Sequence, residues 1–299
     1  MTGIDRSHGQ RVGLVMALGV FVAWGLFPSY FKLLADVPPI EVMSHRIVWS
    51  ALFMAVVLPL GGGVAAFRRA LGDPRVVGLI GLSALLIGIN WLTYVATIAA
   101  GHVLEASLGY FLSPLTNVAL GRLVLGEQLT RLQFLACLLA LGAVAVLALG
   151  TEGEIWRAVV LATSFGFYGL VRKLVRVEAL PGNTLECFLL VPFAGAYLVW
   201  CALSGNSHFG TALPGTSILL ASSGVITAVP LIAYAAAARR LKLSTLGLMQ
   251  FVTPTMVFLL GVLVYDEPFG QAKLGCFVVI WAALALYARE TVRLARRPA

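Results

Sequence analysis

Residues 104–127 read LEASLGYFLSPLTNVALGRLVLGE, and residues 244–267 read STLGLMQFVTPTMVFLLGVLVYDE. A constant offset of 140 residues aligns the two stretches, because 244 − 104 = 140. Eight of the 24 aligned positions are identical, which exceeds the roughly two or three matches that a shared Leu, Val and Gly composition supplies by chance. The identical pairs include Pro114/Pro254, Gly121/Gly261 and Glu127/Glu267. The chain therefore reads as one module written twice.

The composition indicates an integral membrane protein. Apolar residues make up 60% of the 299 positions and charged residues only 11%, whereas about a quarter of the residues are charged in a soluble domain. The apolar residues come in blocks of about twenty, the length that a helix needs to cross the hydrocarbon core of roughly 30 Å. We predict an all-α membrane fold of ten transmembrane spans. They cover residues 11–34, 40–60, 75–99, 103–125, 133–149, 155–174, 184–203, 216–238, 244–264 and 272–288.

The basic residues give these spans a direction. The net charge is +8, and 17 of the 21 Lys and Arg residues fall at the termini or in loops on one side of the ten-span arrangement. Cytoplasmic loops of membrane proteins carry an excess of Lys and Arg. This placement favours a topological signal, with both termini in the cytoplasm, over binding to nucleic acid. The N-terminal residues lack a small-residue cleavage pattern after an apolar core, so we expect the first span to be retained.

The repeat predicts how the two halves are related. Residues 1–150 form the first copy of five spans and residues 151–299 the second, and an odd number of spans makes the second copy enter the membrane the opposite way round. The loop with Glu127 carries Arg122 and Arg131, whereas the loop with Glu267 has little positive charge, in agreement with opposite sides. Substrate binds near the midplane between such inverted repeats and is exposed to either side in turn. The sequence thus predicts a transporter with a central cavity. We expect a monomer, since one chain contains both halves.

Polar and aromatic residues near the middle of the spans are the candidates for the substrate site. A charge such as Arg46 at that depth costs about 2.5 to 3.5 kcal/mol, so it is expected to face a wet interior or a partner. The alternative is that it snorkels or pairs with Glu41. Amides and aromatic rings can instead serve helix packing or an interfacial belt. The recurrence of aromatic residues at repeat-related positions favours a site. The candidates are Trp24, His45, Arg46, Asn90, Trp91, Tyr94, Tyr110, Tyr168, Tyr234 and Gln250.

Four prolines inside the spans are candidate hinges: Pro28, Pro114, Pro230 and Pro254. Each leaves a backbone carbonyl without its helical partner, which favours a kink in the membrane. Tyr110 and Gln250 stand four residues before two of these prolines and differ between the copies. We therefore expect substrate preference to depend on them.

Signals for catalysis and cofactors are absent from the sequence. It contains no GxxxxGK[ST] phosphate loop, no HExxH, no GxSxG and no Cys/His cluster. We therefore expect no enzyme activity, no cofactor and no metal, and a polytopic membrane enzyme or sensor is the alternative from another class. Glu41, Glu105 and Glu186 fall near the ends of spans. Transport is accordingly expected not to depend on a carboxylate at the midplane.

Seven runs of sequence carry a resemblance to a known family. They are FVAWGLFPSYFKLL, HRIVWS, NWLTY, GHVLEASLGYFLSPL, SFGFYGLVRK, VITAVPLIAYAAAARRLKLSTLGLMQFVTPT and the EPF of residues 267–269. With them the chain resembles, over essentially its whole length, the RarD-like branch of the EamA drug/metabolite transporter superfamily. Two places depart from the pattern expected there: Ser113 precedes Pro114 in place of Asn, and VATIAA follows Tyr94 in place of aromatic and amide residues.

The resemblance implies ten helices in an inverted five-plus-five arrangement and a home in the bacterial inner membrane. Related exporters of the YddG kind move amino acids, aromatic ones included. The expected function is therefore a secondary exporter of amino acids or similar small amphipathic metabolites, with the small molecule and the lipid bilayer as partners. The alternative within transport is a multidrug or lipid-related permease of the same fold.

Overall fold

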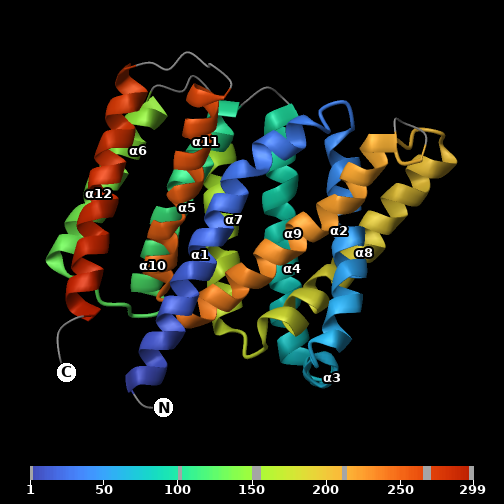
Figure 1. The fold of residues 1–299 in the computed structure, drawn as a ribbon, viewed down its shortest axis with the longest axis horizontal. Helices are drawn as coiled ribbons and strands as arrows, with labels where there is room; N and C mark the ends of the chain where they lie inside the picture. Colours follow the sequence, from blue (N-terminus) through green and yellow to red (C-terminus); the bar gives the residue numbers. More distant parts are fainter. Residues whose placement is uncertain (1–2, 100–102, 150–155, 211–213, 265–270, 296–299) are drawn as a thin grey trace.

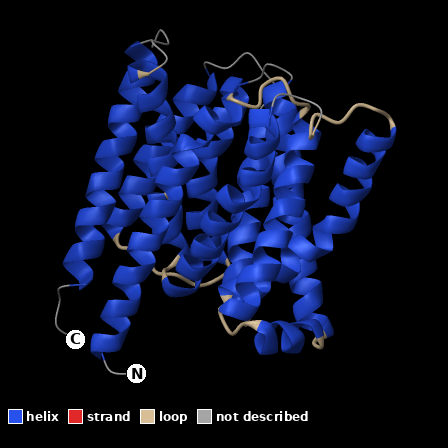
Figure 2. Cartoon of the chain, turned by 45° about the vertical axis from the view of Figure 1, so that its right-hand side comes forward, coloured by secondary structure: helices blue, strands red, loops and turns tan. Residues whose placement is uncertain are grey.

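The structure is a computed structural model that describes residues 3–99, 103–149, 156–210, 214–264 and 271–295. These residues form helices joined by turns, with no strand among them (Figure 2). The helices are α1 (Gly3–Lys32), α2 (Pro39–Leu60), α3 (Val64–Leu71), α4 (Pro74–Ala99), α5 (Val103–Leu123), α6 (Arg131–Leu149), α7 (Trp156–Leu174), α8 (Ala179–Leu203), α9 (Pro214–Arg240), α10 (Leu243–Met249), α11 (Val252–Leu263) and α12 (Gln271–Ala295).

The prediction of an all-α membrane fold is confirmed in its coarse form. Every predicted span overlaps a helix, and the span at 244–264 is divided between α10 and α11. Five helical segments of the described chain are long and apolar enough to cross a membrane: Gly9–Lys32, Pro39–Leu60, Pro74–Tyr94, Ala179–Leu203 and Gly215–Arg240. The short helix α3 was not predicted. Residues 150–155 at the predicted junction of the two copies, Glu267 and the side chain of Glu105 lie outside what the structure describes.

The break between α10 and α11 has a local cause. Pro254 lacks a backbone N–H, and its ring clashes with the carbonyl four residues earlier, which belongs to Gln250. The Gln250 carbonyl instead accepts a bond of 3.0 Å from the Thr253 N–H, and the helix resumes at Val252. The other three predicted hinges, Pro28, Pro114 and Pro230, lie inside continuous helices.

The helices pack side by side as an elongated bundle (Figure 1). Helices α6 and α12 pack on each other at one edge, and α2 and α8 lie at the other, with α1, α4, α5, α7, α9 and α10 between them. The start of α1, the end of α12 and the whole of α3 lie at the same end of the molecule. Exposed arginines mark that end, among them Arg68 and Arg69 on α3. We call it the basic end.

Small residues let the helices cross closely, which is how helices associate in a membrane. A Cβ atom added to Gly224 on α9 would lie 2.4 Å from the backbone carbon of Trp49 on α2. The Ser50 hydroxyl donates to the Gly224 carbonyl at 2.9 Å in the same crossing. A Cβ on Gly247 of α10 would lie 2.7 Å from the Pro114 carbonyl oxygen of α5. Both contacts are to backbone, so only glycine fits without moving a helix.

We predict that Gly224→Ala destabilises the fold whereas Gly78→Ala does not. The first change forces α2 and α9 apart and is expected to cost about 1 to 3 kcal/mol. Gly78 is helical with nothing within 4 Å of an added Cβ, so alanine there adds only helix propensity, about 1 kcal/mol. Thermal unfolding of the two purified variants in detergent tests this, and equal midpoints would contradict the crossing.

Candidate functional site

A buried arginine on α2 is the centre of the strongest candidate site. Arg46 is only 6% exposed, and its guanidinium carbon lies 4.7 Å from the ring centroid of Trp91 on α4 and 4.8 Å from that of Phe31 on α1. Its Nε donates a hydrogen bond of 3.0 Å to the Thr227 hydroxyl on α9. Four helices, α1, α2, α4 and α9, therefore converge on one positive charge.

Three phenol groups stand around the same charge. Tyr30, Tyr94 and Tyr110 all interact electrostatically with Arg46. The rings of Tyr94 and Tyr110 meet edge to face with their centroids 5.5 Å apart. The Tyr30 hydroxyl is held by Ser222 on α9 at 2.9 Å. We call these three tyrosines, with Phe31, Arg46, Trp91 and Thr227, the Arg46 group.

The alternative that Arg46 pairs with Glu41 does not hold. The Glu41 carboxylate accepts bonds of 2.8 Å from the backbone N–H and from Nδ1 of His208. No carboxylate among the described residues forms an ion pair with Arg46. The guanidinium is thus surrounded by rings and hydroxyls and lacks a protein anion within the described part of the chain.

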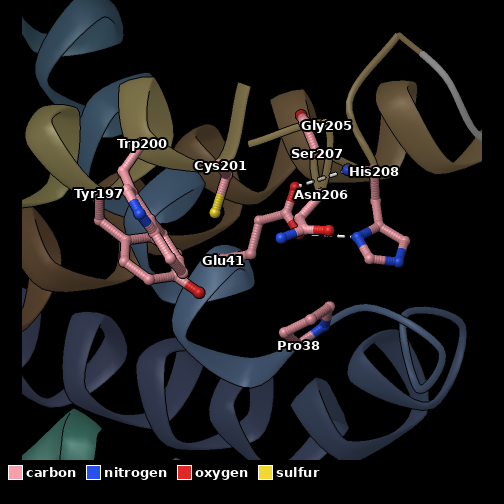
Figure 3. Close-up of a pocket in the computed structure, with 9 residues that line it drawn as sticks. All are labelled: Pro38, Glu41, Tyr197, Trp200, Cys201, Gly205, Asn206, Ser207 and His208. Carbon is pink, nitrogen blue, oxygen red and sulfur yellow. Dashed lines mark hydrogen bonds and ion pairs between the residues drawn. The ribbon is translucent and has the colours of Figure 1, made fainter. Parts of the chain in front are cut away.

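Glu41 and His208 instead belong to a pocket (Figure 3). The pocket lies where α2 begins and α8 ends, opposite the basic end (Figure 1). The pocket has a volume of about 620 Å³ and is lined by Pro38, Glu41, Tyr197, Trp200, Cys201, Gly205, Asn206, Ser207 and His208. The candidate residue His45 lies beside it, 3.9 Å from Glu41, and its ring stacks on Phe209 at 5.0 Å. Because the Glu41 carboxylate of this pocket already accepts two bonds from His208, the Arg46 group is the stronger site.

A second group of rings lies near the Arg46 group, and we call it the aromatic cluster: Phe21, Trp24, Phe165, Tyr168 and Tyr234. The Trp24 and Tyr234 centroids are 5.5 Å apart, and Tyr168 stacks on Tyr234 at 5.8 Å. Trp91 packs against this core while its ring contacts Arg46. The cluster therefore touches the Arg46 group through Trp91.

The two amides among the candidates pair with other helices. Asn90 donates to the Leu161 carbonyl at 2.8 Å and to the Ser164 hydroxyl at 3.0 Å, both on α7. Gln250 accepts a bond of 3.0 Å from the Asn117 amide on α5. Both amides therefore form hydrogen bonds between helices. This is the helix-packing role that we named above as the alternative to substrate binding.

The structure therefore brings together Arg46, Trp91, Tyr94 and Tyr110, and separately Trp24, Tyr168 and Tyr234. Sequence reasoning missed Phe31 and Thr227. Phe31 carried a signal, because it stands seven residues after Trp24 and so two helical turns further along the same face. Thr227 carried none, since its bond to Arg46 joins positions 181 residues apart.

Comparison with known proteins identifies the family. Residues 11–149 match the EamA-like transporter family. Protein RarD of Escherichia coli is 42% identical over 288 residues, which cover 96% of this chain and 97% of that protein. The chain is a RarD-like member of the EamA drug/metabolite transporter superfamily. An uncharacterized transporter of Vibrio cholerae is also 42% identical to this RarD-like chain, over 97% of it and 95% of the relative.

Two further comparisons found a more distant relative and a solved structure with the same fold. The chloramphenicol-sensitive protein RarD of Pseudomonas aeruginosa is 33% identical over 98% of both chains. A solved crystal structure shares the fold with a TM-score of 0.71 at 17% identity, covering 95% of this chain and 99% of the other. The transporter relatives place this RarD-like protein among membrane transporters rather than enzymes. Within the described residues, no group of three or more His, Cys, Asp or Glu side chains is arranged to hold a metal.

We predict an energetic coupling between Arg46 and Trp91. A cation over a desolvated ring is stabilised by about 2 kcal/mol, so Trp91→Leu should lower the free energy of unfolding by more in the wild type than in an Arg46→Met background. A double-mutant cycle of unfolding in detergent measures the difference. Trp200→Leu, at a tryptophan that is 56% exposed, is the control. Identical losses in both backgrounds would disprove the contact.

Proposed function

We propose that this RarD-like protein is a secondary transporter that exports amino acids, aromatic ones included, or similar small amphipathic metabolites across the bacterial inner membrane. The observation that carries the proposal is the Arg46 group, with its buried cation and its surrounding rings. Membership of a transporter family supports a role in transport, and the amino-acid substrate is what we add to it.

The chemistry of the Arg46 group favours an organic acid with an apolar body. A guanidinium binds carboxylate through two parallel hydrogen bonds. Because Arg46 has no carboxylate partner among the described residues, a substrate carboxylate is the natural counter-ion. Trp91 and Phe31 offer faces for an aromatic or aliphatic side chain, and the hydroxyls of Tyr94 and Tyr110 can accept from an ammonium group.

Counterflow of labelled phenylalanine into proteoliposomes tests the substrate class. Arg46→Gln is expected to reduce the rate about tenfold or more, because it removes one partner of a buried charge pair. Arg46→Lys should be intermediate, since an ammonium lacks the planar fork. Arg131→Gln, at an exposed position, should leave the rate within about twofold.

Two competitors sharpen the experiment. Unlabelled 3-phenylpropionate, which keeps the carboxylate, should compete with phenylalanine, and phenethylamine, which lacks it, should not. Equal competition by phenethylamine would rule out carboxylate recognition by Arg46. Absence of counterflow in the wild type would rule out the amino-acid proposal.

The architecture proposed for this activity is an inverted repeat of residues 1–150 and 151–299, which work as one monomer with the basic end in the cytoplasm. Two interhelical bonds support it. Arg46 of α2 bonds to Thr227 of α9, and Glu186 of α8 bonds to Ser83 of α4. The first members are related by the repeat offset, because 46 + 140 = 186, and each reaches the third span of the other copy.

Alternating access requires the basic end to open and close, and contacts there join the two halves. The Glu127 carboxylate, which follows α5, accepts bonds from the backbone N–H groups of Leu243 and Ser244 at 2.7 and 3.0 Å. It also accepts from the Ser244 hydroxyl at 2.6 Å. Helix α5 packs closely on α10 and contacts α11 much less. These features support a state that is closed at the basic end.

We predict that Glu127→Ala opens the basic end. Bonds to a charged group contribute about 1.5 to 3 kcal/mol, so their loss should shift the population toward longer distances between spin labels at residues 122 and 239. Double electron–electron resonance in a background without the four native cysteines measures this. Glu178→Ala is the matched control, because its exposed side chain makes no capping bond at the same end. An unchanged distribution in Glu127→Ala would contradict the role of this carboxylate.

A multidrug permease of the same fold is the second candidate. The observation in its favour is the relative described as a chloramphenicol-sensitive protein, at 33% identity. Chloramphenicol carries no carboxylate, so the same counterflow assay separates the candidates. Exchange of chloramphenicol without exchange of phenylalanine would favour the drug permease.

A further inference from the structure

A buried carboxylate on α8 has no part in the site described above. Glu186 is 2% exposed and stands seven residues after the first residue of α8, about 10 Å along the helix. Sequence reasoning placed it near a span end and gave it no role, because the helix starts at Ala179 rather than at the predicted residue 184. An ionisable group buried within a membrane helix is costly and is a functional candidate by default.

The hydroxyl next to Glu186 suits both protonation states of the carboxyl. Ser83 Oγ is within hydrogen-bond distance of Glu186 Oε1 and lies 3.1 Å from the Ile80 carbonyl. A hydroxyl has one hydrogen and can donate to only one of these oxygens. When Glu186 is charged, Ser83 donates to it. When Glu186 is neutral, its own O–H donates to Ser83, and Ser83 donates to Ile80. Ser83 can therefore bond to the carboxyl in either state by rotating its own hydrogen.

A buried cation beside Glu186 is incompletely paired. Arg172 is 1% exposed, and its Nη2 donates to the Asn183 side chain and to the Ala179 carbonyl at 3.3 Å. Its Nε and Nη1 have no hydrogen-bond partner among the described residues, although the charge of Arg172 acts on Glu186. The arginine therefore has the N–H groups of two nitrogens available to a carboxylate that has lost its proton.

The other charged and titratable groups around α8 do not act on this carboxyl. Interactions with Glu186 come from Arg172 and Tyr168 of α7 and from Ser83 of α4, and Cys187 is its neighbour on α8. Helices α2, α3 and α9 also pack on α8. Their titratable or charged residues are Glu41, His45, Arg46, Arg68, Arg69, Tyr234, Arg239 and Arg240, and none of them contributes an interaction to Glu186. Proton exchange at Glu186 is thus balanced mainly by Arg172.

One residue links this carboxyl to the aromatic cluster. The Tyr168 hydroxyl lies 3.4 Å from Glu186 Oε2, and its ring stacks on Tyr234 at 5.8 Å. Tyr234 in turn contacts Trp24 at 5.5 Å. If the charged carboxylate moves toward Arg172, the Tyr168 hydroxyl loses its hydrogen-bond partner, and Tyr168 is part of the aromatic cluster. Proton loss and the packing of α7 on α9 are therefore connected.

We propose that Glu186 is the proton-binding site through which a pH gradient drives transport, with Arg172 as its alternative partner in the charged state. The proton is taken from water on the acidic side as an O–H bond forms at the carboxyl, and it returns to water on the other side when that bond breaks. The proposal rests on the proposed transport function. It assigns to the protein exchange of substrate against protons.

The experiment separates transport from coupling. Wild-type proteoliposomes that are acidic inside should accumulate labelled phenylalanine several-fold above the level reached without a gradient. Glu186→Gln keeps a polar group for Ser83 and Tyr168 but cannot lose a proton, so it should retain counterflow and lose the gradient-driven accumulation. Glu186→Asp should restore part of the accumulation. Glu290→Gln, at a buried carboxylate on α12 paired with Arg293 at 3.5 Å, should behave as wild type.

A second measurement detects proton binding at Glu186 directly and needs no transported substrate. Infrared difference spectra of the solubilised wild type between acid and alkaline pH should contain a protonated carboxyl band that is absent from Glu186→Gln and shifted in Glu186→Asp. Gradient-driven accumulation in Glu186→Gln, or an unchanged band, would overturn the proton site. Wild-type counterflow without any response to the gradient would overturn coupling and leave the transport function standing. Loss of counterflow in the wild type would overturn the transport function, while the infrared band would still decide whether Glu186 binds a proton.

Discussion

The buried charge of Arg46 is the constraint on which the arrangement of this half of the molecule depends. Moving a cation into a medium of low polarity is unfavourable unless other groups replace the lost water. Here the replacement comes from two ring faces and a hydroxyl on three different helices. Because α1, α4 and α9 each supply one part, the guanidinium is stabilised only when all three pack on α2. A ligand carboxylate at this place would strengthen the same assembly.

The other half of the chain, residues 151–299, also buries a charged group on a membrane helix, and this group is acidic. Glu186 occupies the position that the repeat offset assigns to Arg46, and it is held by α4 as Arg46 is held by α9. Two hydroxyls lie against the glutamate, whereas two ring faces and one hydroxyl stabilise the arginine. Hydroxyls can follow a change of protonation by reversing a hydrogen bond, whereas rings attract only the charged form of a cation. A permanent charge for binding and an exchangeable charge for coupling therefore fit the two environments.

The sequence predicted much of the fold and named several residues of the candidate site, and the reason why it missed the others is physical. Apolar blocks are a local feature of the sequence, so the helices were expected at nearly the observed places. The charge of Arg46 and the ring of Trp91 were visible as expensive or bulky groups at membrane depth, and the structure brings them together. Thr227 and Ser83 are ordinary residues in sequence, and only the crossing of distant helices gives them partners. The start of α8 was placed too late, which hid the depth of Glu186.

The two copies of the opening stretch differ in a way that follows from their prolines and their neighbours. Pro254 breaks its helix and leaves Gln250 at the break, whereas Pro114 lies in a continuous α5. The difference is explained by the crossing between them, since Gly247 lies directly against the Pro114 carbonyl and Asn117 donates to Gln250. A break in α5 at that point would move the backbone on which α10 rests. One copy must therefore stay continuous to support the break in the other, and this places the break of the pair at Gln250 rather than at Tyr110.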